Sequence, residues 1–200
     1  MNPLRSIAKR LRAPFRNAFP AAYWALEYWL AARKVTDKGR DTHRNQQRLF
    51  ASFLADCSGK PCIQISVKDE IGRKFGPNWV SVDKYDTRAA IDRHDDVEDL
   101  KFPDASFHAA VCWSVLEHVP QPQKAISELY RVLEPGGLIW IQVPFLFPYH
   151  ESPRDYWRVS ADGLRLWMAG FEEVGCGYDY WARTSLVAGT YFYGRKPRQR

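Results

Sequence analysis

The stretch FHAAVCWSVLEHVPQPQKAISELYRVLEPGGLIWIQVPF, residues 107–145, decides the fold class. It begins with an apolar run over residues 107–115, which is typical of a buried strand. The segment 121–133 has the apolar spacing of a helix, and the glycines of EPGG, residues 134–137, follow where a helix should stop. A second apolar run covers residues 138–145. Apolar strands that alternate with helices predict a parallel sheet covered on both faces.

The same alternation extends to both sides of this stretch. Residues 61–66 and 78–83 are two earlier strand-like runs. Residues 160–170 predict a helix that is capped by Ser160 and ended by Gly170. The segments 171–180 and 185–196 predict a closing antiparallel pair. We therefore expect one α/β domain with a mostly parallel sheet.

Length and cysteine content set the protein class. The chain has 200 residues, of which 46% are hydrophobic, and this suits a single globular domain. Its four cysteines have neither C-x-x-C spacing nor a histidine at zinc-finger spacing, so we expect no metal site from them. Cysteines scattered among apolar residues suit a reducing compartment, and we expect a cytoplasmic protein.

The net charge of +6 is unevenly distributed. Residues 1–48 hold eleven basic and three acidic residues, and residues 195–200 hold four basic residues and no acid. The intervening body carries a net charge of −6. We divide the chain into a basic helical N-terminal extension (1–48), a domain (49–194) and a basic tail (195–200). The acidic body argues against nucleic acid as the partner.

The N-terminal extension has two parts. Residues 3–19 predict a basic amphipathic helix of a kind that can lie on an anionic membrane surface. The apolar run of residues 18–32 is interrupted by Glu27 and is shorter than the ~20 residues of a transmembrane helix. Packing on the domain, peripheral membrane contact and a targeting role are three alternatives for this run. The polar residues 36–47 predict a linker or an exposed helix.

Acidic side chains follow the second strand and precede the third. Asp83 ends the run NWVSVD, and Asp96 lies in an acidic stretch ahead of residue 107. In an open α/β sheet, ligands bind beyond the carboxyl ends of the strands. A carboxylate at such a position can accept hydrogen bonds from both hydroxyls of a ribose, and Asp96 can accept one from an exocyclic amine.

The ordered motifs DVEDLKFPDASFHAAVCWSVLEHV, residues 96–119, and AISELYRVLEPGGLIWIQVP, residues 125–144, resemble a known family. They are similar to the class I S-adenosylmethionine-dependent methyltransferases, especially the small type-11 group, over about residues 60–170. The segment PYHESPRDYWR, residues 148–158, resembles a subgroup associated with surface-polysaccharide and lipid-linked sugar genes. The resemblance implies a Rossmann-like, doubly wound sheet of seven strands with an antiparallel C-terminal strand, and S-adenosyl-L-methionine as the cofactor.

Carried over by position, the resemblance implies roles for five residues. Asp83 would hold the ribose hydroxyls. Asp96 would bind the adenine amino group, with Val97 beside the ring. Trp113 and Ser114 would line the methionine and sulfonium portion, where an aromatic ring attracts a cation.

The sequence departs from the family after its first strand. The family has a glycine-rich loop there, whereas this chain reads QISVKDE, residues 64–70, without a glycine. We expect backbone amides from Ser66 onward to hold the carboxylate of the cofactor, with Lys68 as its counter-charge.

Catalysis would require an oriented acceptor and removal of its proton, because the methyl group on a sulfonium is already activated. His118 and His150 are the candidate bases, since histidine titrates near neutral pH, and we favour His150. The loop around His150 carries side chains that can stack on a sugar or grip a phosphate: Tyr149, Arg154, Tyr156 and Arg158. Alternatively, these residues form an aromatic cluster with an Arg–Asp155 pair.

We therefore expect a methyltransferase that acts on an oxygen of a small-molecule, sugar or glycolipid acceptor at the cytoplasmic face of a membrane. The alternative is a catalytically inactive scaffold with the methyltransferase fold that binds a partner, which the missing glycines favour. The hypothesis of a nucleic-acid methyltransferase has less support, because residues 113–116 read WSVL where such enzymes have an Asn/Asp-Pro-Pro-aromatic tetrad.

Overall fold

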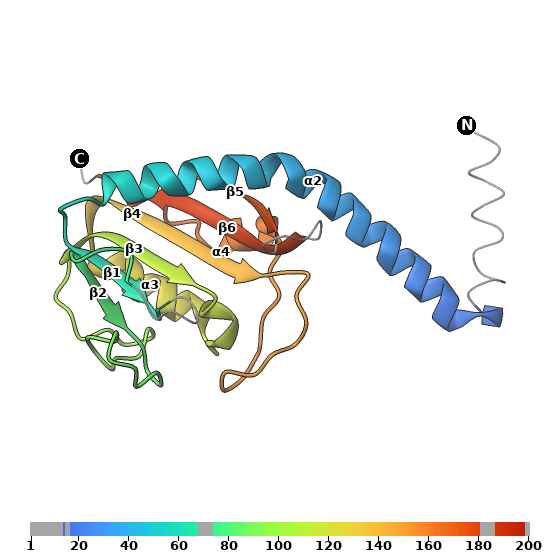
Figure 1. The fold of residues 1–200 in the computed structure, drawn as a ribbon, viewed down its shortest axis with the longest axis horizontal. Helices are drawn as coiled ribbons and strands as arrows, with labels where there is room; N and C mark the ends of the chain where they lie inside the picture. The colour runs from blue at the N-terminus through green and yellow to red at the C-terminus, as the bar shows by residue number, and fades with distance from the viewer. Residues whose placement is uncertain (1–13, 15–16, 68–73, 181–186, 199–200) are drawn as a thin grey trace.

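A computed structural model describes residue 14 and residues 17–67, 74–180 and 187–198. Its centre is a six-stranded sheet with the strand order β2-β1-β3-β4-β6-β5 (Figure 1). The first four strands in this order are parallel, and β6 pairs antiparallel with both β4 and β5. The strands are β1 (Cys62–Ile65), β2 (Trp79–Val82), β3 (Phe107–Trp113), β4 (Leu133–Pro144), β5 (Glu172–Tyr180) and β6 (Val187–Arg195).

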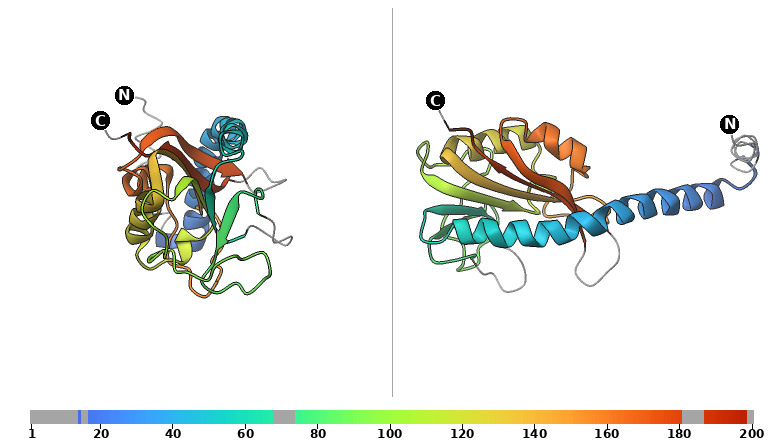
Figure 2. Two further views of the ribbon diagram at one scale, coloured as in Figure 1. Left: turned by 90° about the vertical axis from the view of Figure 1, so that its left-hand side faces the viewer. Right: turned by 90° about the horizontal axis from the view of Figure 1, so that it is seen from above.

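Helices cover both faces of this sheet. The long α2 (Pro20–Asp56) lies along one face, and α3 (Pro122–Val132) and α4 (Ala161–Trp167) lie on the other (Figure 2). A short 3₁₀ helix, η1 (Leu116–His118), follows β3. The side chain of Ser160 accepts a hydrogen bond from the Gly163 backbone and caps α4 as predicted. The prediction of a doubly wound, mostly parallel sheet with an antiparallel C-terminal strand is confirmed.

The number of strands differs from the seven that the resemblance implies. Among the described residues, the connection from β2 to β3 contains no strand, and its pairing with the sheet is a single bridge between Val82 and Arg93. This connection is rich in aspartate, whose side chains bind nearby backbone amides and favour turns over strands. The consequence for the site is that β2 is an edge strand with an acidic loop beside it.

The α2 face of the sheet has an aromatic core. Phe50 and Phe53 of α2 pack on the fully buried Trp140, with ring centroids 4.7 and 5.9 Å from it. Phe53 also contacts Tyr193 of β6 at 5.5 Å. Because α2 is continuous through residue 48, the C-terminal part of the predicted extension continues directly into the core of the domain.

The EPGG segment lies within β4 and not in a turn ahead of it. The pairing of β4 with β3 shifts register between Phe107 and Ala109, which makes the segment a bulge. Gly136 has a φ of 83°, a conformation that favours glycine. The EPGG motif therefore lies in the first part of β4, directly after the end of α3.

Lys196 of the predicted basic tail has a structural role. Its Nζ donates to the carbonyl oxygens of Tyr130 and Leu133 at the end of α3, at 2.8 and 2.7 Å. Its backbone carbonyl accepts a hydrogen bond from Gly136. A cation at this position satisfies carbonyls that a helix end leaves unpaired, so part of the C-terminal positive charge stabilises the fold.

The N-terminal half of α2 projects beyond the sheet (Figure 1). Large apolar side chains on this half are exposed, with Trp24 60% and Tyr28 67% accessible. This half is therefore not packed on the domain. No helix among the described residues is long and apolar enough to cross a membrane. The predicted helix of residues 3–19 lies almost wholly outside the described residues.

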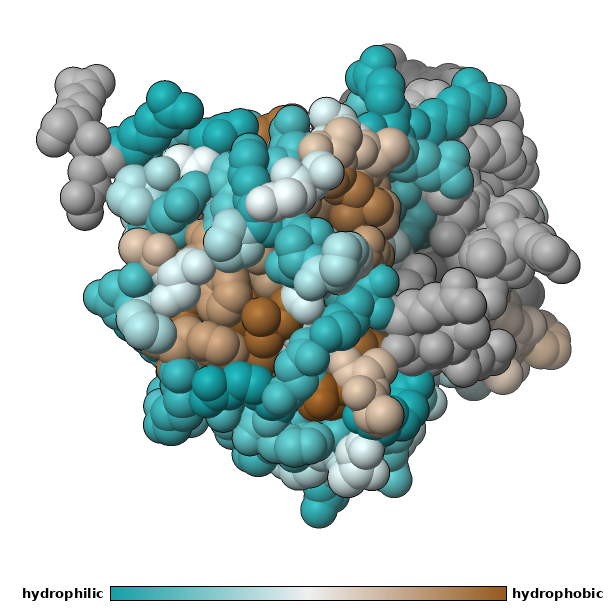
Figure 3. Space-filling model, turned by 60° about the vertical axis from the view of Figure 1, so that its left-hand side comes forward, coloured by the Kyte–Doolittle hydropathy of each residue, from teal (hydrophilic) through white to brown (hydrophobic). Residues whose placement is uncertain are grey.

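The face of the molecule drawn in Figure 3 is mostly hydrophilic, and its hydrophobic side chains gather near the centre within a hydrophilic rim. This surface agrees with the charged body that the sequence predicts.

Candidate active site

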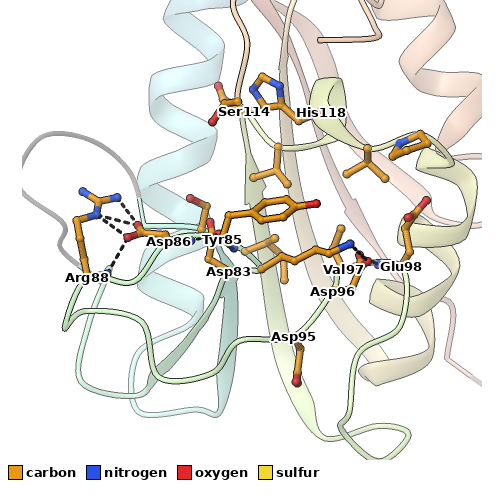
Figure 4. A pocket seen from close by; sticks show the side chains of 17 residues that line it. Asp83, Tyr85, Asp86, Arg88, Asp95, Asp96, Val97, Glu98, Ser114 and His118 are labelled. Carbon is orange, nitrogen blue, oxygen red and sulfur yellow. Dashed lines mark hydrogen bonds and ion pairs between the residues drawn. The ribbon is translucent and has the colours of Figure 1, made fainter. Parts of the chain in front are cut away.

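A cavity of about 430 Å³ opens at the carboxyl ends of β1, β2 and β3, where the strand order reverses between β1 and β3 (Figure 4). Its volume is in the range of about 300–1,000 Å³ that is typical of ligand pockets. This is the position at which open α/β sheets bind ligands. The lining residues are Ile65, Ser66, Asp83, Lys84, Tyr85, Asp86, Arg88, Asp95, Asp96, Val97, Glu98, Ser114, Val115, His118, Val119, Pro120 and Ser152.

Two serines border the cavity in the left-handed backbone conformation. Ser66 directly follows β1 with a φ of 61°, and Ser114 directly follows β3 with a φ of 53°. This conformation is uncommon for residues other than glycine, and such strain is concentrated at ligand sites. Ser66 therefore has a backbone conformation that glycine adopts most readily, in a stretch, residues 64–70, that contains no glycine.

Asp83 directly follows β2 and lines the cavity. Its Oδ1 accepts hydrogen bonds from the backbone amides of Tyr85 and Asp86, both at 2.8 Å. These two bonds fix the carboxylate at the strand end, and a carboxylate has acceptor sites on both oxygens. Oδ2 can therefore accept hydrogen bonds from a ligand.

Asp96 lies across the cavity from Ser114 (Figure 4). Its Oδ1 accepts from the Glu98 amide at 2.9 Å, and its Oδ2 pairs with Lys84 at 2.7 Å. Partial burial raises the pKa of Asp96, but the bonds from Lys84 and Glu98 outweigh this and leave the pKa below its ordinary value. Asp96 is therefore an ionised acceptor beside the buried Val97, as an amine-binding role requires.

A buried carboxylate and two histidines form a cluster next to the cavity, and of the three only His118 lines it, whereas the favoured base His150 does not. Glu117 of η1 is fully buried, and neither of its carboxylate oxygens has a hydrogen-bond partner among the residues that the structure describes. Its Oε1 lies 3.7 Å from Nε2 of His118 and 3.8 Å from Nε2 of His150. Burial raises the pKa of Glu117 to about 8 and lowers the pKa of His118. The structure thus brings the two predicted bases together, with their ring centroids 5.0 Å apart.

The loop after β4 is held in place by an Arg–Asp pair. Arg158 binds both carboxylate oxygens of Asp155 at 2.6 Å and donates to the carbonyl oxygens of Phe147 and Pro148. Asp155 also accepts from the His150 amide at 2.7 Å. Arg158 therefore positions His150, and its donors are directed at the protein instead of at a substrate.

The other predicted substrate residues lie on the surface of this loop. Tyr149 is 66% exposed and donates to Glu151, and Tyr156 is 48% exposed. Arg154 is exposed, and its carbonyl oxygen accepts from Nδ1 of His118. Their side chains are accessible to an acceptor, but none of the three lines the cavity.

Trp113 does not lie where the resemblance puts it. Its ring packs edge-on against Phe50 of α2 at 5.2 Å, on the opposite face of β3 from the buried Cys112, and it does not line the cavity. Neighbouring residues of a strand point to opposite faces, so only one of the pair reaches the α3 side. Lys68 lies outside the described residues.

Sequence reasoning missed Glu117 and several residues of the acidic loop. Lys84, Tyr85 and Arg88 line the cavity because the connection after β2 folds back over the strand ends. Glu117 looks like an ordinary polar residue in the sequence. A possible signal was its place directly after two apolar residues, Val115 and Leu116, and directly before His118.

Comparison with known proteins adds family evidence. Residues 63–141 match the family model described as methyltransferase domain. A probable S-adenosylmethionine-dependent methyltransferase of Mycolicibacterium smegmatis is 38% identical over 52 residues, which is 26% of this chain and 20% of the relative. The chain thus spans about a fifth of the length of that curated relative.

Solved structures share the fold at low sequence identity. A Haloferax volcanii methyltransferase in complex with the Trm112 activator has a TM-score of 0.55 at 15% identity, with 87% of this chain and 96% of that chain covered. Phosphoethanolamine N-methyltransferase 2 of Haemonchus contortus, in complex with S-adenosyl-L-methionine, has a TM-score of 0.54 at 14% identity, with 74% and 52% covered.

The residues around the cavity fit S-adenosylmethionine. The carboxylates of Asp83 and Asp96 face a cavity of suitable volume at the ends of β2 and β3, and Val97 offers an apolar surface between them. Hydrogen-bond acceptors at this edge suit a ribose and an amino group, and negative charge suits a sulfonium cation. The match over residues 63–141, the sheet order and this cavity together support a methyltransferase domain of the class I S-adenosylmethionine-dependent family.

Proposed function

We propose that this protein transfers a methyl group from S-adenosylmethionine to an oxygen of a small acceptor, a sugar or a glycolipid. One observation carries the proposal: the cavity has carboxylates for a nucleoside at one side and His118 at the other, with His150 adjacent. A nucleoside site and a proton acceptor that border the same space are what O-methylation requires.

The cofactor side is assigned to three residues. Asp83 would accept hydrogen bonds from the ribose hydroxyls, Asp96 would accept one from the adenine amine, and Val97 would pack against the ring. When bound, S-adenosylmethionine supplies a methyl group that is activated by its sulfonium. The chain therefore needs to align the acceptor with this methyl group and remove a proton.

The histidines supply the proton acceptor. Nδ1 of His118 donates to the Arg154 carbonyl, so its Nε2 is an acceptor in the neutral ring. Burial lowers the pKa of His118 and favours that neutral form. The acceptor oxygen would bond to the methyl carbon as the carbon–sulfur bond breaks with its electron pair on sulfur, and the hydroxyl proton would go to an imidazole.

The loop of residues 148–158 would hold the acceptor. Tyr149 and Tyr156 are exposed aromatics of a kind that stacks on sugar rings, and Arg154 is an exposed cation that suits a phosphate. These three residues together favour a sugar or a lipid-linked sugar over an apolar acceptor.

Peripheral contact with the cytoplasmic face of a membrane is part of the proposal. It is supported by the exposed Trp24, Tyr28 and Trp29 of α2 and by the basic residues 1–48 around them. Aromatic side chains favour the membrane–water interface, and basic residues favour anionic lipids. A glycolipid acceptor would be found at the same surface.

Partner binding by an inactive domain is the second candidate, and the glycine-free loop of residues 64–70 favours it. The Trm112 complex of the Haloferax volcanii structure is an example of this fold with a protein partner.

The test is transfer of labelled methyl from S-adenosylmethionine into a glycolipid fraction and into a soluble sugar fraction of cells. We expect label in one fraction with the wild type, little with Asp83→Ala, and normal transfer with Asp162→Ala, an exposed acid on α4. Cofactor binding without transfer into either fraction would support the partner-binding candidate instead.

A further inference from the structure

Glu117 forms a cluster with His118 and His150, and the proposed methyl transfer gives this buried carboxylate no role. Their potential ligand atoms, one from each side chain, all lie within 4.8 Å of one another. Ligands at about 2.1 Å from one metal ion are ~3–3.5 Å apart. The two Glu117–histidine distances of 3.7 and 3.8 Å come close to this spacing, so small side-chain rotations suffice.

Both imidazoles are oriented as metal ligands usually are. Nδ1 of His118 donates to the Arg154 carbonyl, and Nδ1 of His150 lies 3.3 Å from the Pro148 carbonyl and 3.5 Å from Asp155. A backbone carbonyl or carboxylate on the remote nitrogen fixes the tautomer and raises the basicity of the other nitrogen. Each Nε2 then carries a lone pair and lies 3.7 or 3.8 Å from Oε1 of Glu117.

Arg158 supports this arrangement. Its Nη2 lies 3.4 Å from Nδ1 of His150, but its donors are already directed at Asp155 and the Pro148 carbonyl. The proton on Nδ1 of His150 therefore has two nearby acceptors, the Pro148 carbonyl and Asp155. The Arg158 guanidinium binds the same Asp155 carboxylate.

Glu117 gives the independent evidence for a ligand. It is fully buried, and no described residue donates a hydrogen bond to either carboxylate oxygen. A buried carboxylate without a donor is costly, and it is found where a proton or a cation compensates it. Two Nε2 atoms within 3.8 Å of Oε1 add nitrogen ligands beside this carboxylate and favour a cation.

We propose that Glu117, His118 and His150 bind a divalent transition-metal cation such as Mn²⁺ or Zn²⁺ beside the cofactor cavity. Two imidazoles and one carboxylate suit these ions better than Mg²⁺, which prefers oxygen ligands. Three protein ligands leave coordination positions open, as in catalytic metal sites. Because His118 lines the cavity, such a position faces the space where an acceptor hydroxyl would lie.

The metal site deepens the proposed function, and its catalytic consequence rests on that function. A cation lowers the pKa of a bound hydroxyl. The two histidines would then serve as ligands, and the hydroxyl proton would go to water instead of to an imidazole. The site would also favour an acceptor with two neighbouring hydroxyls, such as a sugar diol, which can bind one cation twice.

Metal binding to the full-length, tag-free protein tests the proposal without cofactor or acceptor. After treatment with a chelator and its removal, the protein is titrated with MnCl₂ and, separately, with ZnCl₂ by calorimetry. The electron paramagnetic resonance signal of free Mn²⁺, which falls as the ion binds, gives a second readout of binding. We expect one ion per chain and a rise in melting temperature with the ion present.

Three variants make the test specific. Glu117→Gln and His150→Asn should each weaken binding at least tenfold. His108→Asn is the matched control, because His108 also pairs with a glutamate, Glu134, at 2.7 Å, and it should bind as the wild type does. If Glu117→Gln fails to fold, His150→Asn decides, since the His150 side chain is 35% exposed on a loop.

Absence of binding of both ions by the wild type, or equal binding by the wild type and His150→Asn, would overturn the proposal. Neither result would bear on S-adenosylmethionine binding, which a separate titration measures. Failure of the metal site and failure of the proposed methyl transfer are therefore distinguishable.

Discussion

Ser66 and Ser114 are the residues at which the site stores backbone strain. Both follow parallel strands directly, and both have a φ between 53° and 61°. Outside glycine, the left-handed conformation costs roughly 1–2 kcal/mol per residue. The Ser114 amide donates to the Gln142 carbonyl at 2.9 Å, which holds the strained residue in place at the cavity edge.

A β-branched residue should not be tolerated at position 114. We expect Ser114→Val to lower the free energy of unfolding by about 1–2 kcal/mol, because branching at Cβ adds to the left-handed strain. Ser114→Gly should be at least as stable as the wild type. Urea unfolding measures both, and Ser127→Val on the exposed side of α3 is the control. Equal losses for the valines at positions 114 and 127 would show that strain is not the cause.

The sequence predicts some site residues and not others for a physical reason. Asp83, Asp96, Val97 and Ser114 line the cavity as expected, since strand ends place residues at one edge of the sheet. The sequence does not predict to which face of the sheet the Trp113 side chain points, because β3 is buried on both faces and lacks an alternating pattern. The burial of Glu117 arises from tertiary packing that no local pattern encodes.

At the scale of elements, a carboxylate and a guanidinium join α3 to the loop before β3. Arg131 binds both oxygens of Glu128 at 2.8 Å and also donates to the carbonyl oxygens of Leu100 and Phe102. Glu128 in turn accepts from the Leu100 amide at 2.9 Å. This network anchors the end of the acidic loop that carries Asp96.

The network predicts a pH-dependent stability difference. The hydrogen bond from Arg131 lowers the pKa of Glu128 below its ordinary value of 4.5. A lowered folded-state pKa stabilises the protein above the unfolded-state pKa, and this contribution is lost as the pH falls through the folded-state value. Glu128→Gln should therefore cost about 1–2 kcal/mol at pH 7, since hydrogen bonds to charged groups are lost.

Urea unfolding of Glu128→Gln and wild type at a series of pH values checks this. The difference should shrink as the pH is lowered below 4.5. A difference that stays constant with pH would mean that Glu128 acts through packing and not through its charge. Glu173→Gln, a surface partner of Arg165, is a suitable comparison with an expected effect below about 1 kcal/mol.

Elements were predictable where apolar periodicity is strong. The four parallel strands, α3 and α4 were expected near their observed positions, and the closing antiparallel pair is confirmed. The sequence does not decide between a linker and a helix for residues 36–47, because these residues are polar and have no apolar stripe. The strand character of EPGG was missed, since its pairing depends on β3 and β6, which are distant in sequence.

At the scale of the whole molecule, the two halves of α2 differ in their surroundings. This helix has 37 residues and is about 55 Å long. Its C-terminal part carries Phe53 into the core, whereas its N-terminal part projects with exposed aromatics (Figure 2). Residues 1–48 carry a net charge of +8, whereas the domain that forms the cavity is acidic.

Vesicle binding should therefore depend on the projecting half of α2. We expect the protein to co-sediment with vesicles that contain phosphatidylglycerol, and less with neutral vesicles or at high salt. Trp24→Ser combined with Tyr28→Ser should weaken binding about tenfold, which is ~1.4 kcal/mol. Leu166→Ser, at a 79% exposed position of α4, should leave binding unchanged. Equal sedimentation of both variants with the wild type would contradict membrane contact through α2.

The central claim is that the domain, although residues 64–70 after its first strand lack glycine, still binds its cofactor through acids at the strand ends. Calorimetric titration of the full chain with S-adenosylmethionine and with its demethylated product tests it most directly. We predict one molecule bound per chain, at least about tenfold weaker binding for Asp83→Ala because two charge-assisted hydrogen bonds are lost, and unchanged binding for Asp162→Ala. No binding of either compound by the wild type, or equal binding by Asp83→Ala, would contradict the claim.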